Sequence, residues 1–273
     1  MGEKKSATKR LLEKYAYCCL CGGGVKANTR EHVPPKALFD RSHRPNQMVV
    51  PACSACNEGT RTGDTVAAIV ARWGFSEPTT AEREDSQRLI RGIANNHPDI
   101  QLEWLQNSGS VSQRQARRHL ASYGAPIPNE AKFITIGPAT LPYLNQFALK
   151  LTLGIYFEQT LRCFPSTGLF RAFLRFKEDF RGTGLPQKII DIAGDPLALA
   201  QGAWNTREQF EYRAKYNPEN GLFIHASRLR MGLFIVGMAS EDRSVLPNEL
   251  IADWISPGPL SKILDDPHYR DKL

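Results

Sequence analysis

The sequence lacks any long run of uncharged apolar residues, although 41% of its 273 residues are hydrophobic. A membrane-spanning helix needs about 20 consecutive apolar residues, so none is expected. The N-terminal stretch MGEKKSATKRLLEKYAY also lacks the apolar core and small-residue cleavage site of a secretory signal. Internal repeats and low-complexity tracts are lacking as well. These absences predict a cytoplasmic protein that has no membrane partner.

Acidic residues are scarce at the N-terminal end of the chain. Residues 1–50 contain ten lysines and arginines against four acids, a surplus of 10 − 4 = +6, whereas the whole chain carries +7. Clustered cations favour a polyphosphate partner, because binding releases the counterions of that partner. The alternative is a solvated charged surface with no binding role. The charge pattern thus indicates nucleic acid as a partner and leaves the plainer interpretation open.

Cysteine is also rare, with six residues, and four of the six form two C-x-x-C pairs. The paired residues are Cys18, Cys21, Cys53 and Cys56. Two such pairs can supply the four thiolates of one tetrahedral structural zinc ion. The alternatives are disulfides, which a cytosolic setting disfavours, and thiols that are unrelated to one another. Cys19 has no partner at this spacing, and Cys163 lies in an apolar stretch where a buried thiol is expected.

The segment between the two cysteine pairs is longer than a simple zinc ribbon requires. It contains 31 residues, 22–52, whereas about 15 to 20 are usual. Glu31 and His32 stand side by side in it, and Asn57 directly follows the second pair. A carboxylate and an amide oxygen suit Mg²⁺ or Mn²⁺, and a histidine can take a proton from water at neutral pH. Together these groups predict metal-dependent hydrolysis of phosphodiester bonds.

Each of these residues also has a plainer interpretation. Glu31 could form a surface salt bridge with Arg30 or Lys36, and Asn57 could be a helix N-cap. His43 is expected on a solvated loop. The remaining histidines have no partner at ligand spacing and are expected to be structural or on the surface: His97, His119, His225 and His268.

The hydrophobic pattern predicts an α+β protein with an antiparallel sheet near its C-terminus. Helices are expected over 5–16, 65–74, 76–96 and twice within 98–122, the third with Thr and Glu in capping positions. An extended segment, 25–33, is expected to end at Pro34. A linker over 123–131 is expected to precede a strand at 132–137, a buried helix at 141–161 and a meander at 208–216, 222–229 and 232–239. Three parts are predicted: an N-terminal domain over 1–78, a helical connector over 79–125, and an α+β domain over 126–273.

The pattern Cys18-x-x-Cys21, Glu31-His32 and Cys53-x-x-Cys56-Asn57 resembles the HNH (ββα-metal) endonucleases of the zinc-stapled, endonuclease VII-like variety. The resemblance covers about residues 12–75. It implies a small ββα-metal nuclease domain within 1–78, in which Glu31 and Asn57 bind the catalytic Mg²⁺ or Mn²⁺ and His32 is the general base. It also implies an asparagine that orients the base, for which Asn46 is the nearest candidate.

The expected function is therefore a metal-dependent endonuclease that acts on nucleic acid, with DNA as the expected substrate. The alternative is a non-catalytic zinc module that binds nucleic acid and carries a C-terminal interaction domain. The residues expected to contact nucleic acid are Arg30, Lys36, Arg41, Arg44 and Arg61. Arg61 and Asp64 could instead stiffen the start of a helix. Residues 126–273 are candidates for homodimerisation or for binding a regulatory protein.

Overall fold

The computed structural model describes residues 2–73, 78–106, 109–122, 133–176 and 187–265. Its helices are α1 (Gly2–Lys14), α2 (Ser54–Gly59), α3 (Arg61–Val70), α4 (Thr80–Asn96), α5 (Pro98–Leu105), α6 (Ser110–Ala121), α7 (Leu141–Thr160), α8 (Gln187–Ala193) and α9 (Asn248–Ile251). Its strands are β1 (Thr29–His32), β2 (Val49–Ala52), β3 (Leu169–Phe176), β4 (Ala200–Gln201), β5 (Trp204–Asn205), β6 (Phe210–Asn217), β7 (Leu222–Leu229) and β8 (Leu233–Ser240). Short 3-10 helices are η1 (Cys19–Cys21), η2 (Lys36–Leu38), η3 (Asp40–Ser42), η5 (Arg243–Val245) and η6 (Leu260–Asp265). In these described ranges, no helix has the length and apolarity needed to cross a membrane.

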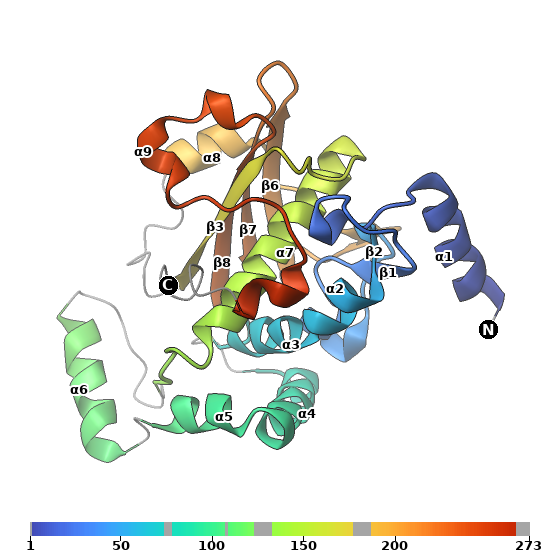
Figure 1. The fold of residues 1–273 in the computed structure, drawn as a ribbon. Coiled ribbons are helices and arrows are strands. Elements are labelled where there is room, and N and C mark those ends of the chain that lie inside the picture. The colour runs from blue at the N-terminus through green and yellow to red at the C-terminus, as the bar shows by residue number, and fades with distance from the viewer. Residues whose placement is uncertain (1, 74–77, 107–108, 123–132, 177–186, 266–273) are drawn as a thin grey trace.

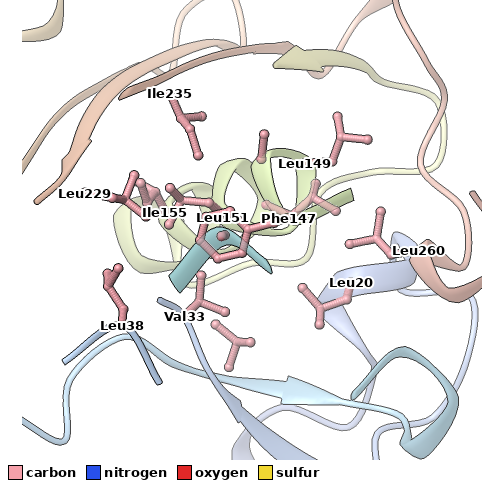
Figure 2. Packing of buried hydrophobic residues seen from close by; sticks show 14 of the residues in the cluster. Leu20, Val33, Leu38, Phe147, Leu149, Leu151, Ile155, Leu229, Ile235 and Leu260 are labelled. Carbon is pink, nitrogen blue, oxygen red and sulfur yellow. The ribbon is translucent and has the colours of Figure 1, made fainter. Parts of the chain in front are cut away.

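Helix α7 lies at the centre of the α+β fold. A four-stranded antiparallel sheet, in the order β3-β8-β7-β6, lies along one side of it, and the hairpin of β1 and β2 lies along the other (Figure 1). Leu151 and Ile155 of α7 pack between Ile235 of the sheet and Val33, which follows β1 (Figure 2). The predicted fold class, α+β with an antiparallel sheet, is therefore confirmed.

Two glycines let α7 approach the N-terminal elements closely. A Cβ atom at Gly154 of α7 would lie 2.4 Å from Cγ1 of Val33. A Cβ atom at Gly63 of α3 would lie 2.8 Å from the carbonyl oxygen of Tyr143. Glycine destabilises the interior of a helix by about 1 kcal/mol relative to alanine. At these two positions the absence of a side chain allows close packing. The first contact brings the end of β1 against the C-terminal half of α7, and the second brings α3 against the N-terminal end of α7.

The three predicted ranges share one hydrophobic core, which runs from Cys18 to Leu260. A buried arginine adds a polar connection between them. Arg230, after β7, donates from Nη1 to Glu82 Oε1 at 2.6 Å and from Nε to the Leu38 carbonyl at 3.1 Å, and it also pairs with Asp40. The division at residues 78 and 125 stays a prediction, and the ranges on either side of it pack together.

Most predicted elements are present near their expected positions. The meander is β6, β7 and β8, and α4 begins with a complete capping box between Thr79 and Glu82. The strand predicted at 132–137 is wrong: residues 133–137 form no strand. The side chain of Gln113 instead bonds both backbone groups of Phe133, at 2.7 and 2.8 Å. The pattern also failed to indicate β3, and the predicted linker at 123–131 lies outside the described residues.

The sheet carries a buried histidine that the sequence assigned only a structural or surface role. His225 of β7 is fully buried, with Nε2 2.9 Å from Thr152 Oγ1 of α7 and Nδ1 3.0 Å from Ser227 Oγ. Gly237 lies opposite it on β8, where a Cβ atom would be only 2.2 Å from Nε2. Burial lowers the pKa of His225 to about 3. The imidazole is therefore neutral in the folded protein at every pH near neutrality.

We expect His225 to make the fold sensitive to acid. The ordinary pKa of histidine is about 6.5, so in the unfolded chain His225 binds a proton below that pH. In the folded chain it binds the proton only near pH 3, and the unfolded state is therefore favoured between these two values. Between pH 7 and pH 5 this costs about 2 kcal/mol of unfolding free energy. Urea unfolding of wild type and His225→Asn at both pH values measures it. The loss should be smaller by about that amount in the variant, and an equal loss in both proteins would contradict the assignment.

Candidate functional site

The four paired cysteines come together as the sequence predicted. Their sulfur atoms all lie within 4.8 Å of one another, and all four side chains are buried. Cys18 is the N-cap of η1 and Cys21 is its last residue, whereas Cys53 caps α2 and Cys56 lies within it. Zinc–sulfur bonds of about 2.3 Å place tetrahedral sulfur ligands ~3.8 Å apart, a separation that is close to this arrangement. Four buried cysteines in this geometry could bind a structural metal such as zinc.

The other two cysteines lie outside this cluster, and all six are free thiols. Cys19 is buried in the hydrophobic core. Cys163 is only half-buried, contrary to the buried thiol expected, and its Sγ donates to the Tyr17 carbonyl at 3.6 Å. It follows the end of α7 by three residues, between the exposed Arg162 and the buried Phe164.

The predicted catalytic pair lies at the end of β1. This strand pairs antiparallel with β2, so that Glu31 lies opposite Val50 and His32 opposite Val49. The strand ends at His32, before Pro34, as predicted. Neighbouring strand residues point to opposite sides, and here Glu31 is buried whereas His32 is partly exposed. The two titratable groups therefore face different surroundings.

His32 is held as a neutral imidazole. Burial, followed by the positive charges of Arg44, Lys36 and Arg30, lowers the pKa of His32 to about 4. The side chain of Asn46 forms a hydrogen bond with His32, which acts in the opposite direction. Asn46 thus reaches the predicted base from the loop before β2. A neutral imidazole with a fixed neighbour has a free nitrogen that can accept a proton.

Arg44 is the most unusual of the five residues predicted to contact nucleic acid. It is buried, and burial lowers the pKa of its guanidinium to about 10. Nη2 donates to the Gln47 carbonyl at 2.6 Å, and the group lies over the ring of Phe39. Its Nε and Nη1 have no hydrogen-bond partner in the described part of the chain. A buried cation with unused donors is costly unless an anion or water pairs with it.

The other predicted nucleic-acid contacts differ in position. The charges of Arg30 and Lys36 act on His32, so both lie near the site. Arg41 is exposed on η3, where its backbone N–H donates to Asp85. Arg61 is exposed at the start of α3. His43 is exposed as expected, and its ring stacks on that of Trp204 at 4.7 Å.

Glu31 has a partner that sequence analysis did not foresee. Lys150 of α7 is fully buried, and its Nζ lies 3.0 Å from Glu31 Oε1, 2.7 Å from Asp64 Oδ2 and 3.0 Å from Thr60 Oγ1. Burial alone would lower the pKa of Lys150, but Asp64 and Glu31 hold it above its ordinary value. The surface salt bridges considered for Glu31 are therefore not its interaction. Asp64 likewise belongs to this buried cluster, and burial raises its pKa to about 6.

Asn57 lies beside β1 rather than at a helix end. Cys53 is the N-cap of α2, so the N-cap interpretation of Asn57 is wrong. Its Nδ2 donates to Thr29 Oγ1 at 3.1 Å and to the Arg30 carbonyl at 3.4 Å. The side chain is thus anchored next to the backbone that precedes Glu31. With Nδ2 donating, Oδ1 is the acceptor atom of this amide.

The donor chemistry at this point fits a divalent cation. Asn57 Oδ1 and the carboxylate of Glu31 are hard oxygen ligands of the kind that Mg²⁺ and Mn²⁺ accept. The two residues lie on neighbouring segments, because Asn57 bonds the carbonyl of residue 30. Glu31 already shares Oε1 with the ammonium of Lys150, which leaves Oε2 as its second donor. Both residues thus offer an oxygen of the chemical type that such an ion accepts, and Glu31 is already paired with an internal cation.

Comparison of the chain with protein-family models, with curated proteins and with solved structures finds no match. The resemblance to the HNH endonucleases accordingly rests on the motif residues described above.

Proposed function

We propose that this protein is a metal-dependent endonuclease that hydrolyses phosphodiester bonds of nucleic acid. The observation that carries the proposal is the environment of His32. A neutral histidine, bonded by Asn46 and surrounded by the charges of Arg44, Lys36 and Arg30, suits the removal of a proton from water beside an anionic substrate. A module that only binds nucleic acid would need the cations but not the bonded, neutral histidine.

Each residue of the site has a distinct task in this proposal. His32 accepts the proton of the attacking water, and Asn46 fixes the orientation of the imidazole. Arg44 supplies positive charge beside His32, which favours the binding of the scissile phosphate there. Glu31 and Asn57 would hold Mg²⁺ or Mn²⁺. Such an ion, when bound, stabilises negative charge on the phosphate and on the leaving oxygen.

The proposal also includes the metal of the four cysteines, the cellular location of the protein and its substrate. Zinc is the metal we propose for the four cysteines, since four thiolates form its common structural site. Six free thiols are kept reduced in the cytoplasm, where we place the protein. DNA is the proposed substrate, and the surplus of +6 within residues 1–50 supports a polyanion as the partner.

The proposal is tested with zinc-loaded, full-length protein and a supercoiled plasmid. We expect nicked or linear DNA in the presence of Mg²⁺ or Mn²⁺ and intact plasmid in the presence of EDTA. Parallel reactions contain single-stranded DNA and RNA, to identify the nucleic acid that is cleaved. If no nucleic acid is cleaved with either ion, while gel-shift assays still show salt-sensitive binding, the protein is the non-catalytic zinc module instead.

A further inference from the structure

A lysine from the C-terminal half reaches the residue proposed to bind the catalytic cation. Lys150 belongs to α7 and not to the β1–β2 hairpin or α2. Its side chain is fully buried, whereas Glu31 retains 12% of its side-chain exposure. The ammonium group therefore approaches Glu31 from inside the fold. The nuclease motif and the central helix of the fold meet at this ion pair.

The three acceptors around Lys150 match its three N–H donors. They are Asp64 Oδ2 at 2.7 Å, Thr60 Oγ1 at 3.0 Å and Glu31 Oε1 at 3.0 Å. Asp64 and Thr60 both belong to the segment that follows α2, and both are buried. If Glu31 moved away, Lys150 would retain one carboxylate and one hydroxyl. Of the two carboxylates, Glu31 lies farther from Nζ, at 3.0 Å against 2.7 Å for Asp64, so it is the one that Lys150 can release more easily.

We propose that Lys150 is a resident cation which neutralises Glu31, and that a divalent cation must compete with it for this carboxylate. The inference rests on the proposed function, in which Glu31 is a ligand of the catalytic ion. A carboxylate already paired with an ammonium attracts a second cation less strongly, and the two cations repel each other. Metal binding at Glu31 is then linked to the position of α7, which gives the C-terminal half control over the site.

The competition predicts opposite effects for two substitutions. Asp64→Asn removes the other acid of Lys150 and leaves Glu31 as its sole carboxylate, so Mn²⁺ should bind at least threefold more weakly. Lys150→Met removes the competitor but adds negative charge to the cluster. The charge-matched variant is Lys150→Met with Asp64→Asn, which keeps the formal charge of Lys150, Asp64 and Glu31 at −1. In this double variant Mn²⁺ should bind at least tenfold more tightly than in wild type.

Binding of Mn²⁺ alone is measured on zinc-loaded, full-length protein from the electron paramagnetic resonance signal of the free ion. Adding Glu31→Gln to the double variant should remove the gain. A gain below tenfold, or a gain that survives Glu31→Gln, overturns the proposal. If the double variant does not fold by circular dichroism, Asp64→Asn decides: weaker binding supports the competition, and equal or tighter binding contradicts it.

This experiment is independent of the test of nuclease activity. Wild-type protein that cleaves DNA but shows none of these affinity changes leaves the nuclease proposal intact and removes the role of Lys150. Protein that shows the affinity changes but cleaves no nucleic acid removes the nuclease function and leaves the ion competition in place.

Discussion

Replacing His32 with alanine is expected to lower the rate of metal-dependent DNA cleavage by about 10²- to 10⁴-fold, the usual contribution of a general base. The reason is the state in which the structure holds this imidazole. Its pKa is lowered to about 4, first by burial and then by nearby cations, so it is unprotonated at neutral pH and able to take a proton. Alanine removes the acceptor while leaving β1 and its pairing with β2 in place. Single-turnover cleavage of a labelled duplex measures the chemical step directly.

The matched control is His43→Ala, which removes a histidine from the same segment. His43 is exposed and stacks on Trp204, so its loss should change cleavage by less than about threefold and test general damage to the loop. Zinc content and melting temperature should be unchanged in both variants. Cleavage by His32→Ala at a rate close to that of wild type would contradict the role of His32, whatever the control shows.

The local features of the site could be predicted because they depend on short spacings. Two C-x-x-C pairs dictate where the chain must converge, and that convergence brings Asn57 to the strand that carries Glu31. The meander was predictable for a related reason. Alternating apolar and polar residues indicate each strand, and a turn signal between two strands indicates that they pair, so the rest of the fold need not be known. Asn46 was the uncertain residue, and the structure places it within hydrogen-bonding reach of His32.

The long-range partners could not be predicted, because no spacing rule joins residues 119 positions apart. Lys150 meets Glu31 across that separation. A signal was nevertheless present: one lysine in the middle of an apolar helix must have a buried counter-charge. The predicted strand at 132–137 is wrong because its local pattern favoured a strand, whereas a tertiary contact holds the backbone in another conformation. Gln113 takes both backbone groups of Phe133 that a neighbouring strand would have used.

Loss of the metal that we propose for the four cysteines should have the largest effect on stability. Structural zinc contributes about 10–16 kcal/mol in zinc-finger peptides, which equals or exceeds the ~5–15 kcal/mol by which most folded proteins are stable. Here the four thiols join η1 to the start of α2, and β1 and β2 lie between them in the chain. Without the metal, the segment that carries Glu31 and His32 loses its attachment at both ends.

Cys53→Ser is therefore expected to lose its zinc, to lower the unfolding free energy by about 5 kcal/mol or more, and to abolish cleavage. Cys163→Ser is the matched control, because its sulfur lies outside the cluster and donates to the Tyr17 carbonyl, which a hydroxyl can also do. Zinc released by a mercurial reagent should be one ion per chain in wild type and control and none in Cys53→Ser. A Cys53→Ser protein that keeps its melting temperature would show that packing against α7, rather than the metal, holds β1 in place.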